Sequence, residues 1–193
     1  MDYKFFVNGV RTIIFNPSGA WQTIDRQNKN IRYIRASLLL PLIILVSVSS
    51  FAGSLLFRNT EMSTTYSVFI GIRTFVELYI TVYLSAYLLG EITYPLDLGK
   101  DFSVSFKMIT FSLVPFLVCQ AFSSLFESLL FVNVIALYGL YIFWEGAEKF
   151  LNPPSYKKMP LLVAATVCTA GIYIASNKLL TSLFDRIFFA FFD

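Results

Sequence analysis

The sequence predicts an all-α fold: an integral membrane helical bundle of about five transmembrane helices, with amphipathic N- and C-terminal segments. Three observations lead to this prediction. Only 14% of the residues are charged and 56% are apolar, whereas soluble domains carry about 25% charged residues, so the charges are too few to cover a surface in water. The apolar residues gather in runs, and about 20 of them cross a hydrocarbon core as a helix. Basic residues gather between alternate runs, as they do on the cytoplasmic side of a membrane.

Residues 1–35 are predicted to form a cytoplasmic amphipathic segment ahead of a membrane domain, residues 36–193. Lys4, Asn8 and Arg11 lie on the polar faces of a first helix. Apolar side chains recur at helical spacing on another face, which predicts a helix lying on the membrane. This apolar stripe consists of Phe6, Val10, Ile13 and Ile14.

A break is predicted at Asn16-Pro17. Asn16 can cap a second helix through its side chain, and Pro17 suits the first helical position because its missing N–H is not needed there. Trp21 lies on the apolar stripe of this second helix and is predicted to contact lipid at the membrane interface.

Five apolar runs make up the membrane domain. The third and fourth runs are separated by Glu127 and neighbouring serines. One continuous helix over both would be about 58 Å long, nearly twice the hydrocarbon thickness, so a tight helical hairpin near Glu127 is the better interpretation. Residues 177–193 either continue the last span or lie on the membrane. The predicted spans are 36–57, 66–89, 106–126, 129–144 and 160–176.

The basic residues predict the orientation. Six precede the first span, two follow the second and three follow the fourth, which places eleven of the 15 on one side. That side is cytoplasmic by the positive-inside rule. The N-terminus is therefore expected in the cytoplasm and, with five spans, the C-terminus outside.

Arg73 and Glu77 are the most unusual residues, because both lie within a predicted span. They are four residues apart on one helix, so they share a face and can pair. A lone charge at the bilayer centre costs roughly 2.5–3.5 kcal/mol on insertion scales. The intramembrane charge pair is either a neutralised structural pair that faces other helices, or a functional site: a proton or ion path, or a site for an anionic headgroup.

Lys157 and Lys158 follow two prolines in the last predicted cytoplasmic loop. They could contact anionic lipid headgroups or a partner protein, and a plain positive-inside loop is the alternative. The chain has no His, and His is the commonest general base and metal ligand. No catalytic constellation or phosphate-binding glycine loop is recognisable, so we expect no enzyme activity, no cofactor and no metal.

The order of these features resembles the Ypt-interacting-protein (YIP) family in its bacterial form. The resemblance implies five spans with a cytoplasmic N-terminus. Eukaryotic members of the family are trafficking proteins that engage Rab-type GTPases. Short loops and few cysteines suit a bacterial inner membrane protein. The residues that carry the resemblance are Asn16-Pro17 with Trp21, GKDFSVSFKMITFSLVP from Gly99 to Pro115, Tyr138-Gly139-Leu140-Tyr141, Gly146, Pro153-Pro154 and Lys157-Lys158.

The first functional hypothesis is a non-enzymatic scaffold or accessory subunit in membrane organisation or in a membrane protein complex. Its expected partners are membrane lipids and a protein partner or further copies of the chain within the membrane, with no nucleic acid. The alternative is a small transporter or channel component that uses Arg73 and Glu77. Five spans are few for a solute carrier, so that alternative requires an oligomer. An intramembrane enzyme is the third hypothesis, which the absence of His disfavours.

Overall fold

The computed structural model describes residues 3–57, 64–126, 132 and 134–192. This part of the chain is almost entirely helical, which confirms the all-α prediction. The elements are, in chain order, α1 (Tyr3–Phe15), α2 (Pro17–Gln27), α3 (Ile31–Ile34), the π-helical stretch η1 (Arg35–Leu39), α4 (Leu40–Phe57), α5 (Thr64–Thr93), α6 (Phe102–Ser112), α7 (Val114–Leu125), α8 (Tyr138–Phe150) and α9 (Ser155–Phe192).

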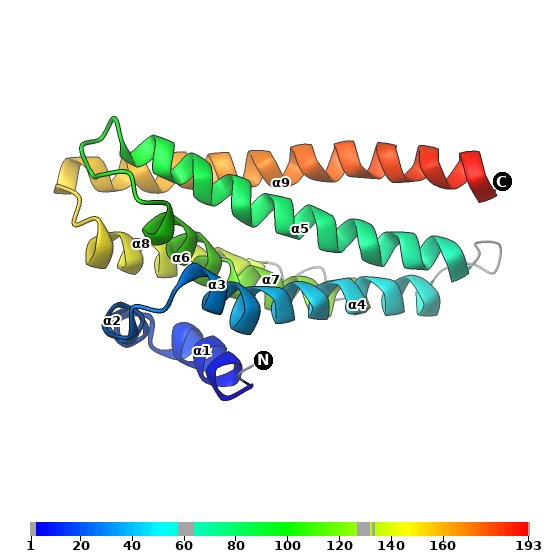
Figure 1. The fold of residues 1–193 in the computed structure, drawn as a ribbon, viewed down its shortest axis with the longest axis horizontal. Helices are drawn as coiled ribbons and strands as arrows, with labels where there is room; N and C mark the ends of the chain where they lie inside the picture. The colour runs from blue at the N-terminus through cyan, green and yellow to red at the C-terminus, as the bar shows by residue number, and fades with distance from the viewer. Residues whose placement is uncertain (1–2, 58–63, 127–131, 133, 193) are drawn as a thin grey trace.

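Three long helices run along the longest axis of the molecule, with α5 packed between α4 and α9 (Figure 1). α3, η1 and α4 continue one another as a single rod. The rod widens into π-helical geometry just before Pro41, whose missing N–H interrupts the regular hydrogen-bond ladder. α6 and α7 meet at a 41° bend. Pro115 in the first turn of α7 removes the N–H that would otherwise continue α6 through the bend.

Three described helices are long and apolar enough to cross a membrane: Ile31–Leu56, Thr64–Thr93 and Ser155–Phe191. The bent pair of α6 and α7 is a fourth candidate if it counts as one span. The expected fourth span, 129–144, is not among them. Its first residues mostly lie outside the described part, and from Tyr138 onward the chain forms α8, a helix of 13 residues that is about 20 Å long. The described residues therefore provide three or four spans instead of the expected five.

The predicted hairpin at Glu127 lies outside the described residues. Its flanks show that no continuous helix joins the third and fourth runs. Phe126 ends α7 in an extended conformation. Gly139, at the start of α8, lies directly on α6, because a Cβ added to it would clash with the Ser112 carbonyl oxygen. α7 therefore ends before this gap, and α8 packs beside α6.

Contacts between loops bring three segments to one end of the molecule. Lys157 at the start of α9 donates to the Leu96 carbonyl oxygen, 2.7 Å away, in the loop after α5. Lys149 at the end of α8 forms a 3.1 Å ion pair with Asp25 of α2. Six of the eleven basic residues predicted to share a side lie between α1 and η1, and the others are Lys100 in the loop after α5, Lys107 in α6, Lys149 at the end of α8, and Lys157 and Lys158 in the first turn of α9. The contacts join the N-terminal segment to α8 and the loop after α5 to α9.

The break at Asn16-Pro17 is confirmed. The Asn16 side chain accepts a hydrogen bond from the Gly19 amide, 3.1 Å away, and Pro17 lies in the first turn of α2. The apolar stripe of α1 packs against the protein, and the position of this helix on the membrane stays a prediction. Ile13 is fully buried, while Phe6, Val10 and Ile14 pack partly buried against the core.

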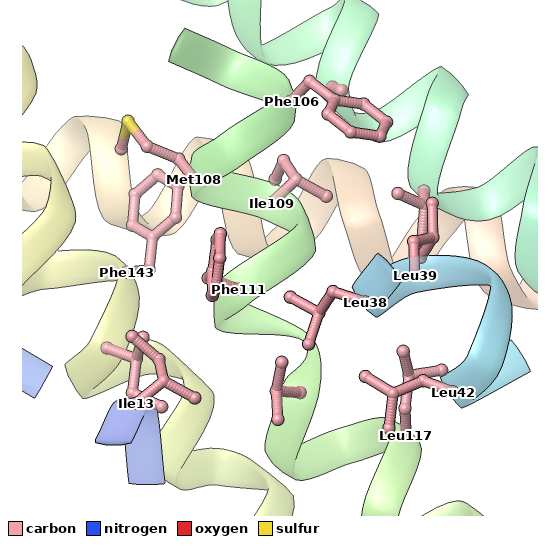
Figure 2. Packing of buried hydrophobic residues seen from close by; sticks show 14 of the residues in the cluster. Ile13, Leu38, Leu39, Leu42, Phe106, Met108, Ile109, Phe111, Leu117 and Phe143 are labelled. Carbon is pink, nitrogen blue, oxygen red and sulfur yellow. The ribbon is translucent and has the colours of Figure 1, made fainter. Parts of the chain in front are cut away.

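The largest buried side chains meet around α6. Figure 2 shows Phe106, Met108, Ile109 and Phe111 of this helix between Leu38, Leu39 and Leu42 on one side and Phe143 on the other. α6 is buried almost all round, and even Lys107 is 5% exposed. α6 thus lies at the centre of the core, and α8 packs one of its sides against it.

Candidate functional site

The inward face of α5 is polar. Its buried residues recur every three or four positions, which is the helical period. In a bilayer such side chains turn away from lipid, toward other helices. The buried polar residues of this face are Ser67, Thr74, Glu77, Thr81, Ser85 and Thr93.

Arg73 and Glu77 each bond to α9 and not to each other. The Arg73 Nη1 donates to the Thr181 hydroxyl over 3.0 Å. The Asn177 amide nitrogen donates to the Glu77 carboxylate over 3.0 Å. Neither residue is in any of the ion pairs within the described part of the chain. The structure therefore places both predicted residues on the expected bundle-facing side, and their partners are uncharged side chains of α9.

A cavity of about 300 Å³ lies beside these two residues. Its walls come from four helices: α4, α5, α7 and α9. α4 and α7 touch beside it, since a Cβ added to Gly53 would clash with the Ser124 carbonyl oxygen. Polar side chains line much of it, and we call it the polar cavity. These side chains are Ser50, Ser54, Arg73, Thr74, Glu77, Gln120, Ser123, Ser124, Tyr173 and Asn177.

The guanidinium of Arg73 keeps unused hydrogen-bonding capacity in this cavity. Its Nε is buried and has no hydrogen-bond partner within the described residues. Glu77 is 3% exposed, so its carboxylate depends on partners inside the protein. The polar cavity therefore offers one cationic donor and one acceptor about one helical turn apart, surrounded by hydroxyl and amide groups.

Trp21 is not where the sequence predicted it. Its side chain is 1% exposed, and its indole N–H donates to the Ile142 carbonyl oxygen over 2.9 Å. The ring packs edge-on against Phe111 and Phe150. Trp21 therefore joins α2 to α8 inside the protein and does not contact lipid at the interface.

Lys157 and Lys158 are both engaged within the protein. Lys157 reaches the loop after α5, as described above, and Lys158 donates to the Glu148 carboxylate over 2.7 Å. This hydrogen bond holds the pKa of Glu148 below its ordinary value. Both lysines therefore fix the first turn of α9 to neighbouring segments, and contact with lipid headgroups remains a prediction.

Sequence reasoning missed the partners on α9. Asn177 and Thr181 are four residues apart and face the same way, a spacing that could have indicated a polar stripe matching that of α5. Asn177 and Thr181 were not identified from the sequence because the fifth predicted span ended at Ser176. No cluster of three or more His, Cys, Asp or Glu side chains that could hold a metal occurs in the described part of the chain.

Comparison with known proteins gives one match. The family model described as the Yip1 domain matches residues 11–176. This range includes Arg73, Glu77 and Tyr173 and ends one residue before Asn177. No curated protein and no solved structure matches the chain.

Proposed function

Given that this chain belongs to the YIP family of membrane proteins, we propose that it is a non-enzymatic scaffold or accessory subunit that assembles with a protein partner through the outer face of α9. The observation that carries the proposal is the uneven burial of the spanning helices. Within the most apolar 18-residue stretch of α9, 17% of residues are buried, against 39% for each of the other two long helices.

The contacts of α9 support a fixed structural role for its inner side. Arg73 and Glu77 hold it at Thr181 and Asn177, and Tyr66 of α5 donates to Asp185 over 2.9 Å. The rest of the surface of α9, which we call its outer face, exposes large apolar side chains along its length. These are Val163, Val167 and Ile174 in the first half of the helix and Leu179, Leu183 and Ile187 in the second half.

Site-specific photocrosslinking in membranes tests the proposal. Val167 is 64% exposed on the outer face, and Ala165, on the same helix, is 5% exposed. A photoreactive residue at Val167 should give a discrete protein adduct, and the matched control at Ala165 should crosslink within the chain only. Co-expression of two differently tagged copies identifies a homo-oligomer. Crosslinks from Val167 to lipid alone would rule out assembly through this face.

A transporter or channel component is the second candidate, favoured by the polar cavity and its charged residues. We expect reconstituted vesicles to show no proton or anion flux above empty vesicles. Flux that is lost in both Arg73→Gln and Glu77→Gln would favour transport over the scaffold role.

We also propose a cytoplasmic N-terminus in a bacterial inner membrane. The eleven of 15 basic residues that the sequence groups on one side support this orientation under the positive-inside rule.

A further inference from the structure

A second cavity adjoins the polar cavity. It has a volume of about 290 Å³ and lies among α5, α6, α7, α8 and α9. Its walls are mostly apolar, and we call it the apolar cavity. Ile109, Phe116, Phe143 and Ala165 contribute to it. Tyr173 lines both cavities, so this one side chain marks their boundary.

Two buried hydroxyl groups line the apolar cavity without a hydrogen-bond partner in the described structure. They belong to Thr81, which is 3% exposed, and Ser112, which is 7% exposed. A buried hydroxyl that makes no hydrogen bond is unfavourable. An acceptor on a bound molecule would satisfy both groups.

The polar groups follow one another in a fixed order along α5. Arg73 lies opposite Thr181, Glu77 lies opposite Asn177, and Thr81 shares the apolar cavity with Tyr173. From Arg73 to Thr81 the helix rises about 12 Å. A molecule lying along this line meets a guanidinium, then a carboxylate, then two hydroxyls, and then apolar walls.

We propose that the two cavities form one binding site for a single-chain acidic amphiphile of the acylglycerol phosphate class. The phosphate binds the free donors of Arg73, since a guanidinium matches an oxyanion geometrically. The glycerol hydroxyl donates to Glu77, the ester carbonyl accepts from Thr81 and Ser112, and the hydrocarbon chain fills the apolar cavity.

The order of the polar groups along α5 determines which lipid headgroup fits the site. A choline or ethanolamine headgroup carries its cation outermost, so it would bring a positive charge to Arg73. An acidic group placed next to the chain without a spacer would meet Glu77 first. A ligand that ends in an acidic group and carries a hydrogen-bond donor between that group and its hydrocarbon chain satisfies both Arg73 and Glu77. This inference concerns the cavities and goes beyond the proposed assembly through the outer face of α9.

Binding to the purified full-length protein in detergent tests the headgroup. The probe is oleoyl lysophosphatidic acid, and the comparators are oleoyl lysophosphatidylcholine and oleyl phosphate, which lacks the hydroxyl. We expect the probe to bind about tenfold more tightly than either comparator, as one charge-assisted hydrogen bond provides. Equal binding of lysophosphatidylcholine would overturn the assignment of the acid to Arg73.

Variants of the two charged residues test their roles. Arg73→Gln should weaken binding of the probe by about tenfold or more. Arg73→Lys should lose less binding affinity because the charge remains. Glu77→Gln should reduce the preference for the probe over oleyl phosphate. Parent-like binding by Arg73→Gln, or an unchanged preference in Glu77→Gln, contradicts the proposal. Thermal unfolding of each variant separates loss of the site from loss of the fold.

A variant that fills the apolar cavity tests whether the hydrocarbon chain of the ligand lies there. Thr169 lines this cavity, so Thr169→Phe should displace the hydrocarbon chain and weaken the probe by about tenfold or more. The same variant should still bind glycerol phosphate as the parent does, because that ligand needs the polar cavity alone. Ala175 is exposed on the same helix, and Ala175→Phe should bind the probe as the parent does. Parent-like probe binding by Thr169→Phe would place the chain elsewhere.

Discussion

Asn177 holds the buried carboxylate of Glu77 from across the helix pair. Side-chain hydrogen bonds between membrane helices contribute about 0.6 kcal/mol on average and up to about 1.7 kcal/mol. A buried carboxylate belongs at the upper end, so Asn177→Leu should lower the free energy of unfolding by about 1–2 kcal/mol. Unfolding in mixed detergent measures this, with Ser182→Leu, an exposed position on α9, as the matched control. Equal stability of the two variants would contradict the assigned role.

A double-mutant cycle separates the two neighbours of Glu77. Because Glu77 bonds to Asn177 and not to Arg73, its coupling free energy with Asn177 should exceed its coupling with Arg73. The cycle uses Glu77→Gln with Asn177→Leu, and Glu77→Gln with Arg73→Gln. A larger coupling with Arg73 would restore the direct pair that the sequence predicted.

At the residue scale, the sequence could predict which side of a helix faces inward and could not predict the partners. Glu77 faces the bundle, as the cost of a charge in lipid requires. Its neighbour Asn177 is 100 positions away in the chain, and nothing in helical spacing determines which helix packs opposite. Trp21 was misplaced for the same reason: a ring suited to the interface suits the space beside Gly146 equally well.

The joint between α2 and α8 depends on a glycine. A Cβ on Gly146 would come within 2.8 Å of the Trp21 ring, which is fully enclosed. Gly146→Ala should therefore displace α2 and cost about 1–3 kcal/mol of unfolding free energy. In a Trp144→Phe background the emission of Trp21 should shift to the red. Gly171→Ala is the control, since nothing lies within 4 Å of its added Cβ. Unchanged emission in Gly146→Ala would mean that the joint tolerates the methyl group.

Elements were predictable where local chemistry decides them. The break at Asn16-Pro17 follows from a cap and a fixed proline dihedral, and both operate within one turn. The span expected at 129–144 depended on apolar length, which cannot distinguish lipid contact from burial in protein. Ile142 and Phe143 of α8 are apolar because they are buried in the protein core.

At the scale of the whole molecule, the arrangement of the helices determines whether the number of membrane crossings is odd or even. Loop contacts place the end of α5 beside the start of α9, and α8 leads into α9 through four residues. The stretch from α6 to α8 therefore begins and ends at one side, however deeply it enters the membrane. If each of the three long helices crosses the membrane once, the number of crossings is odd.

Reporter fusions test the parity directly. A fusion at the C-terminus should behave as translocated, while one inserted in the loop after α5 should behave as cytoplasmic. The loop fusion serves as the internal control for orientation. A cytoplasmic signal from both would mean an even number of crossings and would exclude a return of the chain between α6 and α8. The predicted count of five rested on a span, 129–144, that the described residues do not provide.

The length of α9 has a consequence for the bilayer itself. At 38 residues the helix is about 57 Å long, well beyond a hydrocarbon core of about 30 Å. Lys157 and Lys158 fix its first turn to neighbouring segments. If that turn lies at one membrane surface, the surplus length falls at the other end. The aromatic turns there pack against α5, where Phe188 lies on Tyr66 and Phe69. Hydrophobic mismatch is thus concentrated at one leaflet, and thinning or thickening of the membrane moves these turns between acyl chains and headgroups.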